Sequence, residues 1–167
     1  MLQKNYLAIF QNIFLVKKMP IRKIYIKNIS SKLDFKLPNY ESEGAAGMDL
    51  SANIEKEIKI APGKTSIIPT GLALAIPKNF EIQIRPRSGL AAKNNISVLN
   101  TPGTIDSDYR GEIKVILFNH GSGDFLINNN DRIAQMILTP IIKMNLEETD
   151  NLPETVRGEG GFGSTGK

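Results

Sequence analysis

The sequence contains no cysteine, and His120 is its single histidine. Without cysteine the chain has no disulfides, no zinc–thiolate site and no cysteine nucleophile. A single histidine excludes a metal site built from several histidines, and it limits any serine–histidine–aspartate triad to His120. These exclusions narrow the chemistry, but they say nothing decisive about the redox compartment.

Long apolar runs and blocks of like charge are also missing. No stretch reaches the roughly 18 consecutive apolar residues that a membrane-spanning helix requires, and no block of about five or more like charges occurs. A net charge of +4 can belong to a protein that binds nucleic acid, phosphates or an anionic membrane, but a lysine-rich solvated surface gives the same number. We therefore expect no direct nucleic-acid partner, no membrane association and a cytoplasmic location, with targeting by residues 1–18 left open.

The chain length of 167 residues fits a single domain, and its 41% hydrophobic and 23% charged residues are ordinary for a soluble globular protein. Residues 1–18 lack the clean apolar run of a secretory signal and the arginine and serine of a transit peptide. We expect residues 1–18 to be an extension of unassigned role and residues 19–145 to form the folded domain. Residues 146–167 should be a linker and a glycine-rich closing tail, mobile until something orders it.

Short segments of alternating polar and apolar residues recur from Ile21 onward, separated by turns rich in glycine, proline and asparagine. A period of two is typical of strands with one buried face. Many short strands without an internal repeat indicate an all-β fold, a jelly-roll-like β-barrel or sandwich. We also expect one short helix around Ser88–Lys93. The expected strands are residues 23–27, 58–60, 66–68, 72–76, 80–85, 112–118, 125–127 and 137–139.

The stretch Arg85–Ala91 directly follows an alternating strand and places two arginines beside a Ser–Gly turn. Arginine binds phosphate in a bidentate manner, and turn N–H groups can form an anion-binding nest. An ordinary strand end with exposed arginines would have the same sequence, so the stretch alone leaves both interpretations open.

The stretch Asn100–Glu112 carries a Pro–Gly turn followed by Asp106 and Asp108. On an extended strand these two carboxylates would lie on one face. One of them could take a proton from water while the other sits near a metal-bound phosphate. A polar hairpin with a satisfied aspartate turn is the alternative, and from this stretch alone it is the better interpretation.

Three further stretches are polar or glycine-rich. Asp49 follows a glycine in Ala45–Leu50 and alone indicates a turn. Asp131–Ile137 places Arg132 and Gln135 in an apolar strand, and a structural arginine there would need an acidic partner if buried. Residues 161–167 match the spacing of a phosphate-binding loop, but the strand before it and the helix after it are missing. We reject that interpretation and keep only the idea that glycine N–H groups can approach phosphate closely.

In this order and spacing the five stretches resemble the five motifs of the trimeric dUTPase family, from about Ile24 to Gly166. PRSGLA, GTIDSDYRGE, RIAQMI and RGEGGFGSTG match almost letter for letter. The resemblance implies a β jelly roll that assembles as a homotrimer with three active sites at subunit interfaces. It also implies hydrolysis of dUTP to dUMP and pyrophosphate, which limits uracil incorporation into DNA and supplies dUMP for thymidylate synthesis.

The resemblance implies roles for individual residues. Asp106 matches the general base that deprotonates the water attacking the α-phosphorus, and Gln135 matches the glutamine that helps to hold this water. Tyr109 matches the aromatic residue that packs on deoxyribose and leaves no room for a 2′-hydroxyl, while Asp108 is expected to be structural. The residues that the resemblance places against the substrate are Arg87, Ser88, Gly89, Asn100, Thr104, Ile105, Asp106, Tyr109, Lys114, Arg157, Phe162 and Gly163.

Several contacts follow from the same resemblance. The hairpin with Asn100 reads uracil largely through backbone groups, Phe162 stacks on the base, and Arg157 meets the γ-phosphate. Arg87 and its neighbours would come from another subunit than the hairpin. Mg²⁺ is the implied cofactor, held mainly by the phosphates and water with no direct protein ligand, as suits an ion that keeps its hydration. Asp49 would lie near its water shell or in the supporting network.

The sequence departs from the family pattern at a few positions, and other proteins of the same fold suggest alternative functions. Asn95 and Asn130 stand where glycine is usual, and both turns should survive because asparagine tolerates left-handed backbone. A dCTP deaminase would need a glutamate in place of Asp106, and a bifunctional deaminase–dUTPase is a smaller alternative. A non-catalytic nucleotide-binding regulator should have lost Asp106, Tyr109 or the tail, and all are present.

Overall fold

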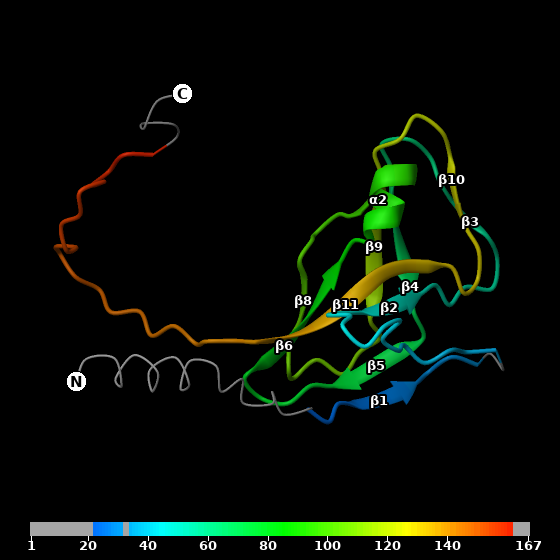
Figure 1. The fold of residues 1–167 in the computed structure, drawn as a ribbon, viewed down its shortest axis with the longest axis horizontal. Helices are drawn as coiled ribbons and strands as arrows, with labels where there is room; N and C mark the ends of the chain where they lie inside the picture. Colours follow the sequence, from blue (N-terminus) through cyan, green and yellow to red (C-terminus); the bar gives the residue numbers. More distant parts are fainter. Residues whose placement is uncertain (1–21, 32–33, 162–167) are drawn as a thin grey trace, which may run out of the picture.

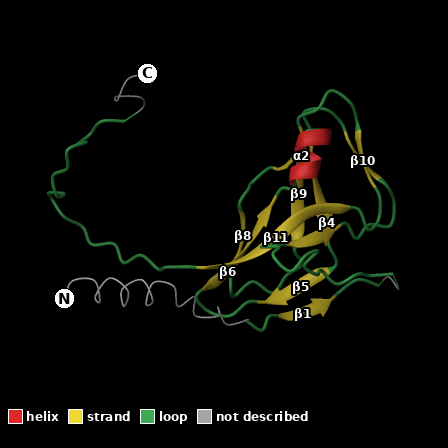
Figure 2. Cartoon of the chain, viewed as in Figure 1, coloured by secondary structure: helices red, strands yellow, loops and turns green. Residues whose placement is uncertain are grey.

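The computed structural model describes residues 22–31 and 34–161, and this part of the chain is built from short strands (Figures 1 and 2). The expected all-β fold is confirmed. Within the described residues there is one helix, α2 (Ser88–Asn94), which confirms the helix expected around Ser88. The strands are β1 (Tyr25–Asn28), β2 (Met48–Ser51), β3 (Ile58–Ile60), β4 (Thr65–Pro69), β5 (Leu72–Ala75), β6 (Phe80–Arg85), β7 (Ile96–Val98), β8 (Gly103–Ile105), β9 (Lys114–Asn119), β10 (Phe125–Ile127) and β11 (Arg132–Pro140).

The strands pair in antiparallel fashion into small sheets. The largest has the order β2-β11-β6-β8, and a second has the order β4-β9-β7. β1 pairs with β5, and β3 pairs with β10. Because consecutive strands are seldom neighbours, residues far apart in the sequence meet in one sheet. β8 lies at an edge of the largest sheet, a position that matters for the site below.

The core forms where the inner faces of the sheets meet. In β9 the buried side chains alternate with half-exposed ones, so that Val115 and Leu117 point inward. In β6 the same alternation buries Ile82 and Ile84. These residues belong to one hydrophobic cluster that draws on nearly every strand. Complete burial of one such side chain contributes about 1.5–3 kcal/mol, so this cluster is the main support of the site that the loops carry.

Three strands were missed from the sequence. β2 contains Asp49 and had been interpreted as a turn, β7 is only three residues long, and β8 had been interpreted as part of a polar turn after Pro102. β11 joins into one strand the segments expected at residues 131–137 and 137–139. Each of these strands is defined by its pairing with a distant strand, which overrides a weak local pattern.

Asparagine occupies left-handed backbone at three positions. Asn95 ends helix α2 with φ of 56°, and Asn130 has φ of 68° in the turn before β11. Asn79 adopts φ of 67° in the turn before β6. The expectation that Asn95 and Asn130 replace glycine without loss of the turn is confirmed, because their short polar side chains tolerate this region.

Beyond Pro140 the chain leaves the body of the protein. Ile141 still donates its N–H to the carbonyl of Asn79, at 2.9 Å. Residues 142–161 then run outward without pairing to any strand in the described part of the chain (Figure 1). No helix among the described residues is long and apolar enough to cross a membrane.

Candidate functional site

A cavity of about 250 Å³ opens beside the loop of residues 106–113, which joins β8 of one sheet to β9 of another and is called the hairpin below. It brings together five residues expected at a substrate site, and its apolar walls come from strands of the neighbouring sheet. Ile67 of β4 and Ile116 of β9 face each other in register on one side. The lining residues are Ile67, Thr104, Ile105, Asp106, Tyr109, Glu112, Lys114 and Ile116.

Ile67, Ile116 and Glu112 line the cavity although no motif in the sequence assigns them a role there. Ile67 is an apolar residue with 60% of its surface exposed. Alternation along β4 could have shown that Ile67 faces outward. Its position opposite Ile116 depends on strand pairing and could not be read from the sequence.

The loop after β8 places Asp106 at this cavity. Thr104 lies opposite Gln83 in β6, so the start of the loop is held by the sheet. The chain then turns, and Tyr109 donates its N–H to the carbonyl of Asp106 at 3.2 Å. Arg110 donates Nη1 to two loop carbonyls at 2.7 Å each, which braces the turn from outside. The suggestion that Asp106 and Asp108 share one face of a strand is wrong, because β8 ends before both.

The far end of this hairpin is anchored to the core. Glu112 accepts the N–H of Gly71 through Oε1 at 2.9 Å. Ile113 donates its N–H to the carbonyl of Leu72 at 2.8 Å, and its own carbonyl accepts the buried hydroxyl of Thr70 at 2.6 Å. Lys114 follows directly, exposed and 3.6 Å from Glu112. The cavity therefore has one fixed wall before any ligand binds.

Asn100 lies just outside the cavity lining, at the base of the hairpin. Its side chain lies over Gly103, where a Cβ would come within 3.0 Å of the Asn100 Nδ2 atom. A side chain at Gly103 would thus displace the Asn100 amide. The structure brings Asn100 to the start of β8, as expected for a residue of the hairpin.

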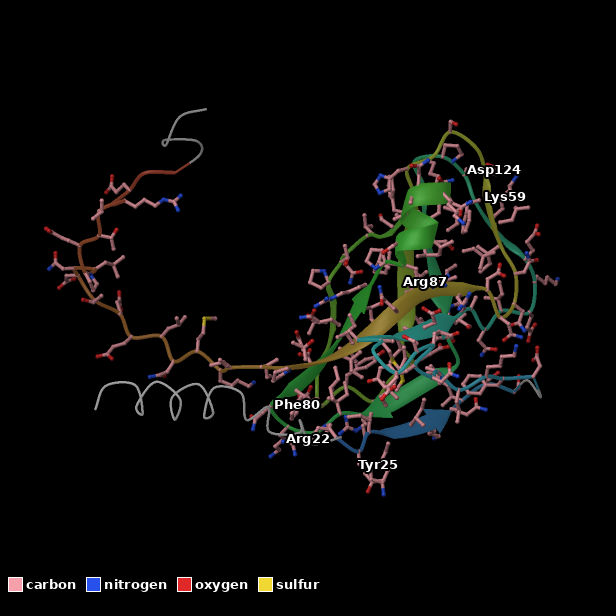
Figure 3. The ribbon with its side chains drawn as sticks, viewed as in Figure 1. Arg22, Tyr25, Lys59, Phe80, Arg87 and Asp124 are labelled. Atoms are coloured by element: carbon pink, nitrogen blue, oxygen red, sulfur yellow. The ribbon has the colours of Figure 1, made fainter. Side chains whose placement is uncertain are left out.

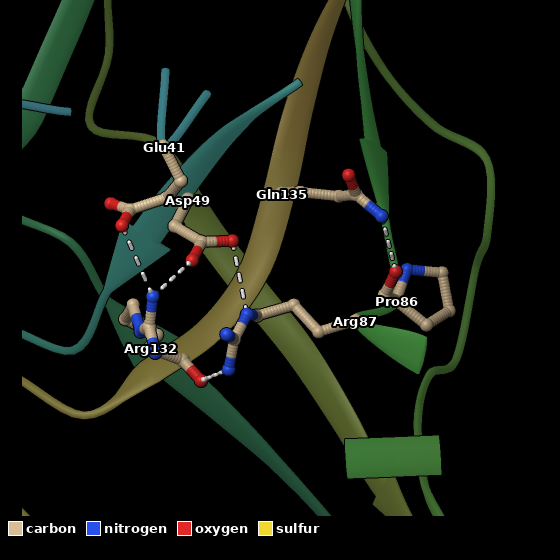
Figure 4. A network of polar contacts seen from close by, with 6 residues as sticks. All are labelled: Glu41, Asp49, Pro86, Arg87, Arg132 and Gln135. Atoms are coloured by element: carbon tan, nitrogen blue, oxygen red, sulfur yellow. Dashed lines mark hydrogen bonds and ion pairs between the residues drawn. The ribbon is translucent and has the colours of Figure 1, made fainter. Parts of the chain in front are cut away.

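A second cluster is a network of alternating charges at the opposite edge of the same sheet (Figure 4). Asp49 of β2 accepts Nε of Arg87 at 3.0 Å through one carboxylate oxygen, and Nη1 of Arg132 at 3.1 Å through the other. Arg87 also donates Nη1 to the carbonyl of Arg132 at 3.1 Å, and Arg132 lies 3.6 Å from Glu41. Asp49 is the least exposed member, at 18%. The network thus has Asp49 at its centre.

Arg132 reaches this network because of an irregularity in β11. Its register with β2 shifts between Arg132 and Ala134, and such a bulge redirects the side chains around it. The sequence interpretation expected an acidic partner for Arg132 if it were buried. The side chain is about half exposed, yet it has two acidic partners, and Glu41 had not been anticipated.

Gln135 contacts the residue that precedes Arg87. Its Nε2 donates to the carbonyl of Pro86 at 2.9 Å, and a Cβ at Gly47 would lie only 2.8 Å from its Oε1. A side chain at Gly47 would therefore displace this amide. Asp49, Gln135 and Arg85 are also aligned across three neighbouring strands, so the sheet itself fixes their spacing.

Ser88 and Gly89 form the first turn of α2, directly after Arg87. N–H groups in the first turn of a helix have no partner within the helix. Both residues are exposed, and open space surrounds the position of a Gly89 Cβ. Ser88 and Gly89 are therefore accessible at the corner where Arg87 joins the charge network, and their contact with phosphate stays a prediction.

The tail residues are remote from both clusters. Arg157 donates Nε to the carbonyl of Gly160 at 2.6 Å, a local contact within the outward-running segment (Figure 1). Phe162 and Gly163 lie outside the described residues. Asp49, Arg87, Gln135 and Arg157 are all absent from the lining of the hairpin cavity. Within one chain, the residues expected at the substrate site therefore lie in three separate regions: the hairpin cavity, the charge network and the tail.

The metal expectation can be compared with the carboxylates. Among the described residues there is no group of three or more histidine, aspartate or glutamate side chains that could hold a metal ion. Asp49 uses both of its carboxylate oxygens on arginines. The expectation of Mg²⁺ held mainly by phosphates and water stays a prediction.

Comparison with known proteins identifies the family of this chain. The family model for dUTPase matches residues 34–166 of the chain. The chain is 53% identical over 148 residues to the deoxyuridine 5′-triphosphate nucleotidohydrolase of Rickettsia bellii strain OSU 85-389, covering 89% of this chain and 98% of the relative. It is 57% identical over 132 residues to the enzyme of that name from Brucella melitensis biotype 2, covering 78% and 84%. The chain belongs to the dUTPase family.

Solved structures agree on the fold. A mutant dUTPase of Staphylococcus bacteriophage 80alpha with dUpNHpp superposes with a TM-score of 0.78 at 22% identity, covering 88% of this chain and all of that chain. A mutant dUTPase from phage phi11 of S. aureus, described with a structural Mg(II) ion, gives a TM-score of 0.71 at 19% identity and covers 80% of this chain and all of that chain. At these identities the likeness shows the shared fold.

Proposed function

We propose that this protein hydrolyses dUTP to dUMP and pyrophosphate. The observation that carries the proposal is the position of Asp106, at the edge of a cavity whose other walls are β8, Tyr109 and apolar residues. A carboxylate beside a nucleoside-sized cavity is placed to act on a phosphate at its mouth. Membership of the dUTPase family supports the same reaction.

The chemical step needs one base and good positioning. Asp106 takes a proton from water as the water oxygen bonds to the α-phosphorus. The bond from that phosphorus to the oxygen bridging to the β-phosphate breaks, and pyrophosphate leaves with the electron pair. Gln135 helps to hold the water. Such reactions depend mainly on positioning and charge neutralisation, which arginines and a divalent ion supply.

Recognition of uracil follows from the place of β8 in its sheet. β8 pairs with β6 on one side only, so along its other edge every second residue, and hence one of Thr104 and Ile105, offers its backbone N–H and C=O groups. These groups complement the N–H and carbonyl groups of uracil. Cytosine would leave a buried donor or acceptor unpaired, and the 5-methyl group of thymine would meet the closed hairpin.

The phosphate chain is proposed to meet the corner formed by Arg87, Ser88 and Gly89. A guanidinium has five N–H donors, and Arg87 directs one each to Asp49 and the Arg132 carbonyl. The remaining donors can bind phosphate while Asp49 fixes the plane of the group. Mg²⁺, when bound with the nucleotide, supplies further neutralisation of the phosphate charge.

We propose that the separated clusters are brought together in a homotrimer, the assembly that the resemblance implies. Two exposed apolar surfaces support association of copies. Ile142, Met144 and Leu146 are 95%, 85% and 86% exposed and alternate with polar residues, so in an extended chain they lie on one face. Such a row of apolar residues is costly in water unless another surface covers it.

A matching surface lies on the body of the protein. An apolar groove of about 670 Å³ opens between β1 and the largest sheet, with Ile26, Leu37 and Leu138 among its walls. Arg22 lies at its margin, 5.4 Å from the centre of the Phe80 ring (Figure 3). β1 pairs only with β5 in the described chain, so its outer edge is available to another strand. We propose that residues 142–146 of a neighbouring copy occupy this groove.

Replacing Ile142, Met144 and Leu146 by serine should abolish stable assembly, because burial of each of these side chains is worth about 1.5–3 kcal/mol. The variant should run as a smaller species in size-exclusion chromatography with light scattering, and dUTP turnover should fall with it. Leu126→Ser, at an exposed leucine of β10, is the matched control and should keep the native mass. An unchanged molecular mass for the triple variant would contradict the proposal that residues 142–146 bind in the groove of a neighbouring copy.

The substrate proposal is tested by measuring pyrophosphate release with Mg²⁺ from dUTP, dTTP, dCTP and UTP. We expect dUTP to be preferred over each of the others by at least about a hundredfold in kcat/KM, because a wrong hydrogen-bond pattern or an added group in a closed site costs several factors of ten. Ammonia release from dCTP would favour the deaminase alternative. Tight nucleotide binding without pyrophosphate release would favour a non-catalytic regulator.

A further inference from the structure

The ring of Tyr109 lies against the backbone of Gly111. A Cβ placed on Gly111 would fall 2.6 Å from the ring carbon Cζ and 3.0 Å from Cε2, and closer still to the hydroxyl oxygen. Carbon atoms do not approach an aromatic ring so closely. Gly111 is also not one of the glycines with left-handed φ, which are Gly63, Gly71 and Gly158 among the described residues. The backbone therefore does not require glycine at this position, but the tyrosine ring does.

The hydroxyl end of the same ring is held as well. Tyr109 donates its hydroxyl to the carbonyl of Glu112 at 2.9 Å. Glu112 in turn is fixed by its side chain to the N–H of Gly71. An aromatic side chain that is 44% exposed would otherwise sample several rotamers. The two contacts define one ring position on the cavity wall before a ligand arrives.

We infer that Gly111 is a positioning residue for sugar selection, acting through Tyr109. The inference rests on the proposed function and on the role that the resemblance implies for Tyr109, whose ring would pack on deoxyribose and exclude a 2′-hydroxyl. A methyl group at position 111 displaces the ring from the hairpin backbone and breaks its contact with the Glu112 carbonyl. Since the ring is half exposed, it has solvent to move into, and the cavity widens beside the sugar.

The test is the preference for dUTP over UTP, measured as the ratio of the two kcat/KM values. Gly111→Ala should lower this ratio by at least about tenfold, since one group more or less in a fitted pocket is worth factors of this size. Gly123→Ala is the matched control, because a Cβ there meets nothing within 4 Å and its φ is not left-handed. An unchanged ratio in Gly111→Ala would overturn the inference.

A double substitution separates positioning of the ring from general damage to the hairpin. If Gly111 acts only through the ring, Gly111→Ala should have no further effect on the ratio in a Tyr109→Ala background. Any loss of Tm in Gly111→Ala should likewise be restored when Tyr109 is truncated. Additive effects on the ratio, or a loss of Tm that truncation does not restore, would count against it.

The wild-type measurement distinguishes the two levels of the inference. A wild-type protein without preference for dUTP over UTP would refute the proposed sugar selection itself. A wild-type protein with a clear preference that Gly111→Ala retains would refute only the role of Gly111.

Discussion

Asp106→Asn should lower kcat for dUTP about a thousandfold, in the range that loss of a general base produces, while dUTP still binds. Asparagine has nearly the same shape as aspartate but cannot accept the proton of the attacking water. The side chain is exposed beside the cavity, so the substitution should leave the stability of the fold unchanged. Single-turnover kinetics and calorimetric titration with dUTP and Mg²⁺ measure the two quantities separately.

Asp108→Asn is the control for this experiment. Asp108 lies in the same turn two residues away, is also exposed, and is absent from the cavity lining. Its substitution removes the same charge from the same loop, so it reports any effect of charge alone. We expect a change in kcat of no more than about threefold, since surface charge is largely screened by water and salt. Similar losses in both variants would show that Asp106 is not the base.

Deletion of residues 157–167 should reduce turnover by roughly a hundredfold, because closure of a segment over the substrate completes the site and positions it. The described part of this segment makes only local contacts, such as those between Arg157 and Gly160 and between Gly158 and Thr155. None of these contacts supports the core. Tm and molecular mass should therefore be those of the full chain.

Arg157→Ala in the full-length protein separates the contribution of the guanidinium to turnover from that of the rest of the tail. It removes the guanidinium proposed to meet the γ-phosphate and leaves the rest of the tail in place. An intermediate loss of kcat is expected, with the remainder due to the closing segment itself. A truncated protein that turns over dUTP at the rate of the full chain would refute the role of the tail.

The strands that the sequence predicted are those with clear alternation, and β6 was predicted to the residue. β2 and β8 were not, because they are only four and three residues long and their strand character comes from pairing with β11 and β6. The site shows the same limit. The motifs placed Asp106 and Tyr109 in one hairpin, but they could not place Glu41 beside Arg132. That contact depends on the path of a loop and on a bulge in β11.

The separation of the hairpin cavity from the charge network around Asp49 also could not be predicted from the sequence. Asp49 and Gln135 are far apart in the sequence, yet sheet register makes them neighbours. Asp106 and Arg87 are only a short stretch apart, yet they belong to different clusters. The expected domain boundaries and the cytoplasmic location stay predictions.

The network around Asp49 has an electrostatic consequence for the protein before nucleotide arrives. Its two carboxylates and two guanidinium groups sum to zero charge. A bare pair of arginines at this corner would attract every polyanion in its surroundings, since uncompensated positive charge raises non-specific association. The neutralised pair offers directional hydrogen bonds without a strong long-range field. A ligand is therefore retained there only if its shape and hydrogen-bonding groups fit at contact distance, and negative charge alone is not sufficient for binding.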